Sequence, residues 1–245
     1  MNGASMSVSA SVKPPRQVLD SIYAFPPNRS TLGGTAYLVT PSIVEKSAEK
    51  GAGLRTSNPS ANLLIDCPAW NEAYADFLLE RGGVRWLVVT HRGGSSQVKE
   101  WQQRLECEVV VQEQEAYLLP GVEVSEFRDR YSFNPGQYAL WTPGHSPGSA
   151  CVYTPQYGGV LFTGRHLLPN RQGQSVPLRL SKTFHWPRQL RSVQRLQTAF
   201  SPETLSHICP GASIGFLRGQ ATIQQAYDQL QAIDLAGLRQ VPAGP

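Results

Sequence analysis

The stretch VRWLVVTHRGGSSQVKEWQQRLECEVVVQ, residues 84–112, constrains the fold more than any other part of the chain. It begins with a continuous apolar run, which is typical of a strand buried on both faces. After a histidine and a loop of small residues, Val98, Trp101 and Leu105 recur at the spacing of one helix face. A second apolar run follows them. The stretch therefore predicts a β-α-β unit.

The segments before this stretch extend the same pattern. Residues 35–40 and 62–66 are expected to form paired strands, and residues 71–83 a helix that ends at Gly82. The first half of the chain is thus expected to alternate as βαβαβ.

The second half has short strands punctuated by Gly and Pro, which suit an antiparallel meander. The predicted elements are strands at 137–146, 149–154 and 158–164, a helix at 186–200, a strand at 205–211 and a helix at 218–233. Two β-rich halves, each with its own helices, predict an α/β fold in which two sheets pack together with helices outside. This architecture is a four-layer αββα sandwich.

The 245 residues, 40% of them hydrophobic, are expected to form a single domain over residues 18–236. Residues 1–17, rich in Ser, Ala and Pro, are expected to be a disordered lead, and residues 237–245 a loose tail. An organellar transit peptide is the alternative for the lead, which has no acidic residue but is short and weakly basic. Residues 41–62 predict a long hairpin loop.

The sequence also bounds the location of the protein. No apolar run approaches the roughly 18 residues needed to span a bilayer, and the N-terminus lacks the apolar core of a secretory signal. We therefore expect a cytoplasmic protein. Its cysteines form no C-x-x-C pair, so they indicate neither a zinc ribbon nor a disulfide framework and are expected in the core. They are Cys67, Cys107, Cys151 and Cys209.

Five short motifs resemble those of the metallo-β-lactamase fold superfamily, in the same order and at about the same separations. They are NLLIDCP, VVTHRGGSSQ, WTPGHSPGS, VLFTGRHLL and ICPGAS, within a resemblance that covers roughly residues 22–235. TPGHSPGS followed by VLFTG is its most specific part. The resemblance implies the αββα sandwich, and it implies hydrolase or oxidoreductase chemistry with one or two metal ions, usually zinc, between the sheets.

Most metal ligands of that family are replaced in this chain. The family motif T-H-x-H-x-D-H, aligned on Thr90, places its first ligand on His91, and the fourth histidine of the family falls on His145. The other five positions cannot bind a metal. They are Gly93, Ser95, Ser96, Arg165 in place of the bridging aspartate, and Ala212.

Catalytic zinc needs about three protein ligands and a bound water, so two histidines do not suffice. Arg165 moreover places a permanent positive charge where a carboxylate would bridge two cations. The ordinary metallohydrolase mechanism is therefore in doubt. With no metal, we expect an open, water-filled cleft, and the alternative is a cleft closed by Arg165 folding across it.

The remaining polar residues admit simpler roles. Ser95 and Ser96 are expected to cap the following helix rather than to act as nucleophiles. His166 and His185 could rebuild a metal site, but their spacing matches no ligand pattern. The resemblance implies that Asp66 is a structural residue that orients the metal-binding loop.

Positive charge is concentrated in one segment. Residues 161–200 contain seven Lys or Arg and no Asp or Glu, whereas the other 205 residues contain 15 basic and 18 acidic residues. Because the segment begins at the former metal site, we expect the cleft to attract a small anion or an acidic protein surface. The expected binding residues are His91, His145, Arg165, Ser95 and Ser96. A solvated basic face is the alternative, and nucleic acid is disfavoured because no recognised binding motif is present.

Two function classes follow. The first is a superfamily member without metal or other cofactor, a pseudoenzyme that acts as a binding protein. The second is a hydrolase that keeps activity through one weakly held metal or rebuilt ligands. The lost ligands favour the first class, although fold alone does not decide activity.

Overall fold

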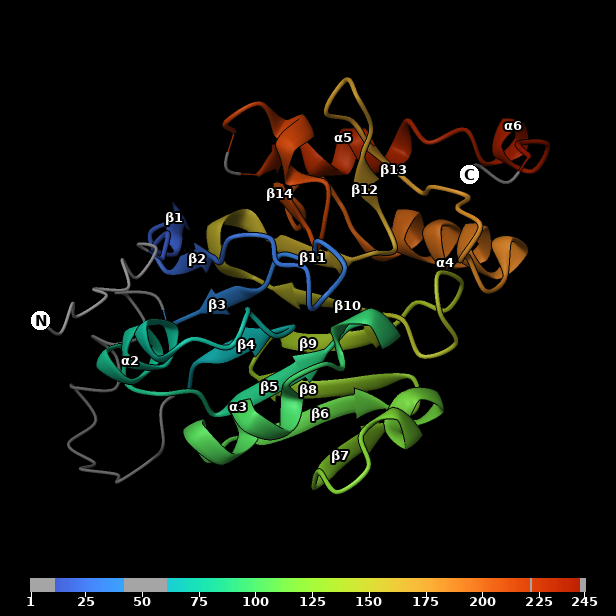
Figure 1. The fold of residues 1–245 in the computed structure, drawn as a ribbon. Coiled ribbons are helices and arrows are strands. Elements are labelled where there is room, and N and C mark those ends of the chain that lie inside the picture. The colour runs from blue at the N-terminus through green and yellow to red at the C-terminus, as the bar shows by residue number, and fades with distance from the viewer. Residues whose placement is uncertain (1–11, 42–60, 221, 243–245) are drawn as a thin grey trace, which may run out of the picture.

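The computed structural model describes residues 12–41, 61–220 and 222–242 (Figure 1). The strands are β1 (Arg16–Leu19), β2 (Ile22–Ala24), β3 (Tyr37–Val39), β4 (Leu63–Ile65), β5 (Trp86–Val89), β6 (Glu108–Gln112), β7 (Val124–Phe127), β8 (Arg130–Asn134), β9 (Gln137–Trp141), β10 (Ala150–Thr154), β11 (Val160–Gly164), β12 (Leu168–Pro169), β13 (Ser175–Val176), β14 (His207–Pro210) and β15 (Ile223–Gln224). The α-helices are α2 (Glu72–Glu80), α3 (Val98–Leu105), α4 (Trp186–Ala199), α5 (Ala226–Gln231) and α6 (Leu235–Leu238). Short 3-10 helices are η1 (Arg92–Gly94), η2 (Glu113–Leu118), η3 (Gln156–Gly158) and η4 (Ile214–Leu217).

The first sheet contains β1 to β7 in chain order. Strands β3 and β4 pair antiparallel, as the sequence predicts, and β4, β5 and β6 are parallel, with α2 and α3 as the connections. All four residues of β5 are buried, which agrees with its continuous apolar run. The predicted βαβαβ half is confirmed.

The second sheet has the order β15-β14-β11-β10-β9-β8. Strands β8 to β11 form the predicted antiparallel meander. Helix α4 then returns the chain to β14, which pairs parallel to β11. The two carboxyl ends of β11 and β14 therefore lie at the same edge of the sheet.

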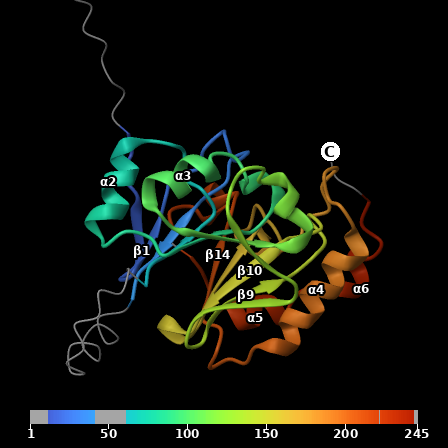
Figure 2. The ribbon, with the colours of Figure 1, turned by 90° about the horizontal axis from the view of Figure 1, so that it is seen from below.

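Three hydrophobic clusters fill the spaces between four layers. One lies between the sheets and includes Tyr37 and Phe162, one joins the first sheet to α2 and α3, and one joins the second sheet to α4 and α5. Figure 2 shows α2 and α3 on one side of the strands and α4 and α5 on the other. The αββα sandwich predicted from the two halves is confirmed.

The predicted helix over residues 218–233 is wrong in its first half. Ile223 pairs with Ile208 in a strand, and the helix begins only at Ala226. Ile223 is buried and β-branched, so it packs better on the sheet than on a short amphipathic helix. Gln225, at φ 51°, then turns the chain from the strand into α5.

The structure describes part of each predicted end of the chain. Strand β1 begins at Arg16, inside the predicted lead, and Gln17 pairs with Tyr23. At the other end α6 crosses the predicted boundary at 236, and the Leu238 carbonyl accepts a hydrogen bond from Trp186 Nε1 at 2.9 Å. Residues 1–11, 42–60 and 243–245, which include most of the predicted hairpin loop, lie outside the described residues.

All four cysteines are buried and unpaired, as expected of core residues. Within the described ranges, no helix is both long enough and apolar enough to cross a bilayer.

Candidate functional site

The ends of strands from both sheets meet at one edge of the sandwich. Asp66 directly follows β4, His91 lies two residues after β5, and Arg165 directly follows β11. His145 belongs to the loop after β9. This loop also contacts the residue before α4, since the His185 amide donates to the Gly144 carbonyl at 2.9 Å. Residues far apart in sequence thus converge, as at the ends of strands in many α/β binding sites.

Asp66 fixes the end of β5. Its carboxylate accepts hydrogen bonds from the Thr90 amide at 2.8 Å and from Thr90 Oγ1 at 2.6 Å. Asp66 itself has φ 57°, a left-handed conformation in which short polar residues are tolerated. Burial raises its pKa to about 6, against the opposing effects of the Thr90 hydrogen bonds and of Arg165. The orienting role expected for Asp66 agrees with these contacts.

The two sheets approach closely beside Thr90. A Cβ atom on Gly164 would lie 2.4 Å from Thr90 Oγ1, and the backbone there has φ 49°. Only glycine meets both conditions without strain. Gly164 therefore lets β11 deliver Arg165 against the end of β5.

Arg165 lies across the cleft and contacts His91 directly. Its Nε–H donates to His91 Nε2 at 2.9 Å, and its Nη2 donates to the carbonyls of Thr31 at 3.0 Å and Leu32 at 2.6 Å. These bonds tie three distant segments together. The expectation of an open cleft is wrong, and the alternative, in which Arg165 folds across, is what the structure has. Three acceptors for one guanidinium explain why the closed arrangement is favoured.

The hydrogen bonds determine the protonation state of His91. Since Nε2 accepts a bond from Arg165, the ring is neutral and carries its proton on Nδ1, which lies 3.2 Å from Thr90 Oγ1. The donors then run in one direction, from Arg165 to His91, to Thr90 and to the Asp66 carboxylate. Burial lowers the pKa of His91 well below its usual value, and the charge of Arg165 lowers it further.

His145 lies beside His91, with ring centroids 6.0 Å apart. Its pKa is lowered to about 4 by burial and by the positive charges of Arg165 and Arg92. Arg92 is half-exposed and has its Nε 3.8 Å from the buried Glu115 carboxylate, which also accepts the Gly148 amide at 3.1 Å. Two guanidinium groups thus act on one neutral imidazole.

His166 lies deeper than this pair. It is fully buried, and neither ring nitrogen has a hydrogen-bond partner within the described part of the chain. Burial lowers its pKa to about 3. Gln189 Nε2 donates to the His166 carbonyl at 2.9 Å, so α4 is joined to the end of β11 here.

The residues at this edge do not fit a catalytic zinc. A Cβ atom on Gly93 would lie 3.1 Å from His91 Nε2, so the second ligand position of the family does face His91, but glycine supplies no donor. The lone pair of Nε2, which a metal would need, already accepts from Arg165. Over the described ranges, no three His, Cys, Asp or Glu side chains gather into a group able to hold a metal ion.

Ser95 and Ser96 do not cap α3, contrary to expectation. Gln97 occupies the N-cap position at φ 67° without a side-chain capping bond. Ser95 Oγ donates instead to the Arg92 carbonyl at 2.9 Å, and Ser96 Oγ donates to the Ser30 carbonyl at 2.7 Å. The two serines therefore stabilise η1 and the loop around Ser30, because Gln97 rather than a serine stands at the N-cap position of α3.

His185 is exposed whereas His166 is fully buried, and within the described part of the chain the two do not belong to a group of three or more potential metal ligands. His185 is the N-cap of α4, where Nδ1 accepts from the Arg188 amide at 3.2 Å. Sequence reasoning missed two other participants, Arg92 and Glu115. Arg92 could have been predicted, because it is adjacent to His91 in sequence. Glu115 lies in η2, and no sequence motif connects it to the site.

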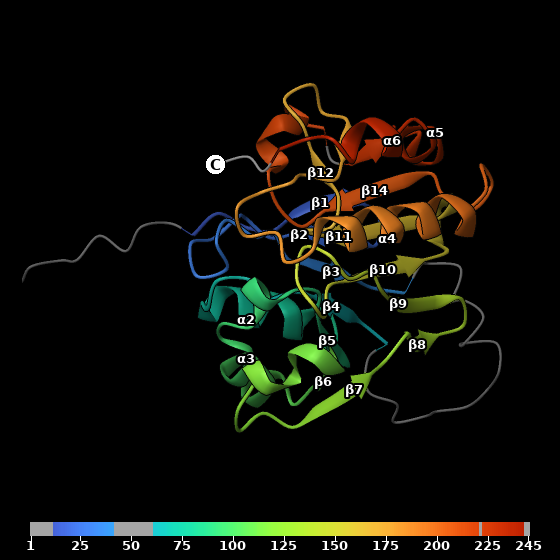
Figure 3. The same ribbon diagram turned by 90° about the vertical axis from the view of Figure 1, so that its right-hand side faces the viewer.

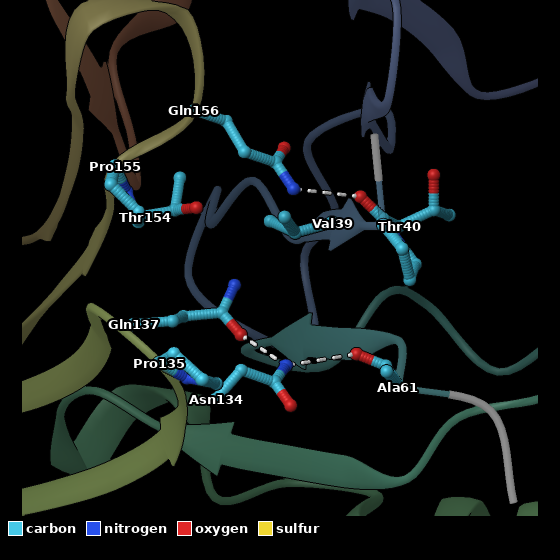
Figure 4. A pocket seen from close by; sticks show the side chains of 10 residues that line it. Val39, Thr40, Ala61, Asn134, Pro135, Gln137, Thr154, Pro155 and Gln156 are labelled. Carbon is cyan, nitrogen blue, oxygen red and sulfur yellow. Dashed lines mark hydrogen bonds between the residues drawn. The ribbon is translucent and has the colours of Figure 1, made fainter. Parts of the chain in front are cut away.

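The opposite edge of the sandwich holds a pocket of about 320 Å³ with different chemistry (Figure 4). Its lining residues are Val39, Thr40, Pro41, Ala61, Asn134, Pro135, Gln137, Thr154, Pro155 and Gln156, all uncharged. Gln156 Nε2 donates to the Thr40 carbonyl at 3.2 Å, and Asn134 Nδ2 donates to Gln137 Oε1 at 2.9 Å. The ionisable side chains of the candidate site therefore lie at the other edge, where β4, β5 and β11 end.

Comparisons with solved structures agree with this architecture. A di-iron-bound form of TTHA1623 is 22% identical, with 77% of this chain and 94% of that protein aligned at a TM-score of 0.53. TTHA1429, a metallo-beta-lactamase family protein from Thermus thermophilus, is 18% identical over 88% of this chain and 78% of that one, at 0.56. A metallo-beta-lactamase from Staphylococcus aureus is 14% identical over 94% and 69%, at 0.58. At these identities the likeness establishes the fold.

Comparison with curated proteins finds no match. The sequence pattern of the metallo-beta-lactamase superfamily, however, matches residues 74–204, more than half of the chain. That range includes His91, His145 and Arg165. With the sandwich fold and the strand-end site in place, the chain belongs to the metallo-beta-lactamase superfamily.

Proposed function

We propose that this chain is a pseudoenzyme of its superfamily, which binds a small anion beside Arg165 at the edge of the closed cleft and does not carry out zinc-dependent hydrolysis. The observation that supports this is the bond from Arg165 Nε–H to His91 Nε2 at 2.9 Å. It uses the nitrogen lone pair that a metal would need and puts a cation in the place of one. Arginine stays protonated in proteins, so no ordinary pH frees the site.

The charges around His145 support an anionic ligand. Both Arg165 and Arg92 lower the pKa of His145, so both guanidinium groups lie near this ring. Arg165 uses Nε and Nη2 for His91 and the backbone, and the described residues provide no acceptor for Nη1. Guanidinium groups bind phosphate, sulfate and carboxylate oxygens with charge-assisted hydrogen bonds. A small oxyanion between Arg165 and Arg92 is the ligand class that fits.

Metal content tests the first half of the proposal. Wild-type protein incubated with zinc and desalted is expected to keep well under about one equivalent, since two ligands do not suffice. Arg165→Asp removes the competing donor and adds a carboxylate beside His91 and His145, so this variant is expected to retain up to about one zinc per chain. Arg165→Asn, which lacks the charge, is the matched control and is expected to retain less. Tight zinc binding by the wild type would overturn the proposal.

Thermal stability tests the second half. Phosphate or sulfate should raise the melting temperature of the wild type more than chloride at equal ionic strength, because an anion that binds the native state stabilises it. Arg92→Gln should remove most of this increment, whereas Lys99→Gln, which removes an exposed charge on α3, should leave it unchanged. An equal anion response in both variants would place the anion elsewhere.

A further inference from the structure

A second group of arginines lies on the outward face of α4 and is separate from the cleft. Arg188, Arg191 and Arg195 follow one another at i, i+3 and i+7, so they share one side of the helix. At 1.5 Å of rise per residue, the stripe is about 10 Å long. The opposite side of α4 packs against the second sheet through Val193 and Leu196, so the arginine face is directed away from this core. Figure 3 shows α4 lying alongside the strands of the second sheet.

These arginines line a groove rather than a flat surface. The groove has a volume of about 510 Å³, and its other residues are Trp141, Pro143, Ser192, Gln194 and Thr198. Trp141 stands at the end of β9, and its indole N–H donates to the Pro147 carbonyl at 2.9 Å. With that polar atom satisfied, the ring presents an apolar wall to the groove beside Pro143. The site therefore combines three cations with an apolar side.

The three charges do not serve folding. Among the residues that the structure describes, none of these guanidinium groups has an acidic partner or a hydrogen bond. Like charges three and four residues apart on a helix repel each other. The whole segment 161–200 contains no Asp or Glu that could relieve this repulsion locally. A row of unpaired, mutually repelling cations in a groove fits an external anionic partner.

We propose that the α4 groove binds a short acidic segment of a partner protein in an extended conformation. An extended chain rises about 3.3 Å per residue, with alternate side chains on one side. A stripe of about 10 Å therefore faces three or four residues, with carboxylates at i and i+2 directed at the arginines and a side chain between them free to contact Trp141. Each guanidinium can bind a carboxylate with two parallel hydrogen bonds.

Charge elsewhere in the chain favours a short acidic segment over nucleic acid. Outside residues 161–200 the chain has 15 basic and 18 acidic residues, so a long polyanion gains no general attraction beyond the stripe. The groove also offers one tryptophan, whereas single-stranded nucleic acid is usually held by successive aromatic platforms. The proposal is independent of the anion proposed for the cleft, since the two sites share no residue.

Fluorescence anisotropy with a fluorescein-labelled hexapeptide of alternating Glu and Ala tests the proposal at low salt. The triple variant Arg188→Gln, Arg191→Gln, Arg195→Gln keeps good helix formers on an exposed face, and circular dichroism verifies its fold. Its affinity is expected to fall by at least about tenfold, while Lys99→Gln stays within about twofold of the wild type. Equal binding by the triple variant, or no binding by the wild type, would refute the proposal.

Two further measurements identify the occupant. An oligothymidine of the same length is expected to bind more weakly than the peptide; tighter binding that the triple variant abolishes would make the groove a nucleic-acid site and overturn the proposal. Sedimentation of the wild type is expected to match that of the triple variant. Self-association lost only in the triple variant would make a second copy of the chain the occupant, and would equally overturn the proposal.

Discussion

Arg165 and the arginines of α4 come from the same basic segment, yet they differ in the partners that their guanidinium groups have. Arg165 is partly buried and donates to His91 and to two backbone carbonyls. Arg188, Arg191 and Arg195 line an open groove and make no such bonds within the described part of the chain. A charge removed from water must find partners in the protein, whereas an exposed charge keeps its hydration.

The difference separates structural from recognition roles. Burial lowers the pKa of Arg165, and the nearby Asp66 carboxylate opposes this, while hydrogen bonds to His91 and two carbonyls hold the guanidinium in place. Removing it would leave acceptors without donors. Removing an arginine from the α4 groove would leave nothing unsatisfied, so a loss should appear in binding rather than in stability. Substitutions at Arg165 and Arg191 test this difference.

The largest expected effect is that of Arg165→Ala on stability. It leaves His91 Nε2 and the carbonyls of Thr31 and Leu32 without their donor, and we expect the free energy of unfolding to fall by about 2–4 kcal/mol. The groove substitution Arg191→Ala should not lower it, because this side chain has no partner among the described residues. Urea denaturation of the two variants measures both values.

Arg165→Lys separates charge from geometry in the same experiment. Lysine keeps the charge but cannot donate in two directions from a planar fork, so an intermediate loss is expected. If Arg165→Ala and Arg191→Ala destabilised the protein equally, the distinction between the two environments would be contradicted.

The second effect concerns pH and His166. This ring is buried and has a pKa of about 3, whereas in the unfolded chain the pKa is about 6.5. The unfolded state therefore binds a proton that the native state does not, and stability is lost as the pH falls from about 6.5 toward 3, by up to about 1.4 kcal/mol per pH unit. His166→Phe should reduce this slope. Urea midpoints measured from neutral pH to about pH 4 provide the test.

Other groups at the same edge titrate in this range but do not disturb the comparison of His166→Phe with the wild type. Burial also lowers the pKa values of His91 and His145, which adds acid sensitivity to both proteins. Asp66, with a pKa raised to about 6, acts in the opposite sense, because its ionised form is less stable when buried. Parallel stability curves for the two proteins would show that His166 gains a proton without unfolding.

The parts of the fold that the sequence predicts correctly are those with strong periodicity. Strand β5 and helix α3 bury every residue or one regular face, so a window of the sequence contains the signal. Strands β7 and β8 are mostly half-exposed, and their pairing depends on distant neighbours rather than on their own pattern. Strand β15 was mistaken for helix for the same reason, because only its pairing with β14 decides it.

The candidate site was predictable in position but not in contacts. Motif order placed His91, His145 and Arg165 at the meeting strand ends, and the structure brings them together. The bonds of Arg165 to Thr31 and Leu32 cross more than 130 residues of sequence, and they depend on one side-chain conformation among many. That choice decided between an open and a closed cleft, and no local pattern encodes it.

The smallest expected effect is a gain in stability from Arg191→Glu. Residue 191 has Arg188 three positions before it and Arg195 four positions after it, so the change replaces two repulsions with two attractions. Helix pairs of this kind contribute about 0.2–0.5 kcal/mol each, and like-charge pairs cost a similar amount, so the free energy of unfolding should rise by roughly 0.8–2 kcal/mol at low salt. Arg191→Gln, which only removes the repulsions, should gain about half as much. Both gains should shrink at about 1 M salt, where exposed charges are screened.

A loss of stability in Arg191→Glu would mean that the arginine has a structural partner after all, and the α4 groove would then resemble the environment of Arg165. A gain in stability together with weaker binding of the acidic peptide would show that the stripe is kept at the expense of the fold.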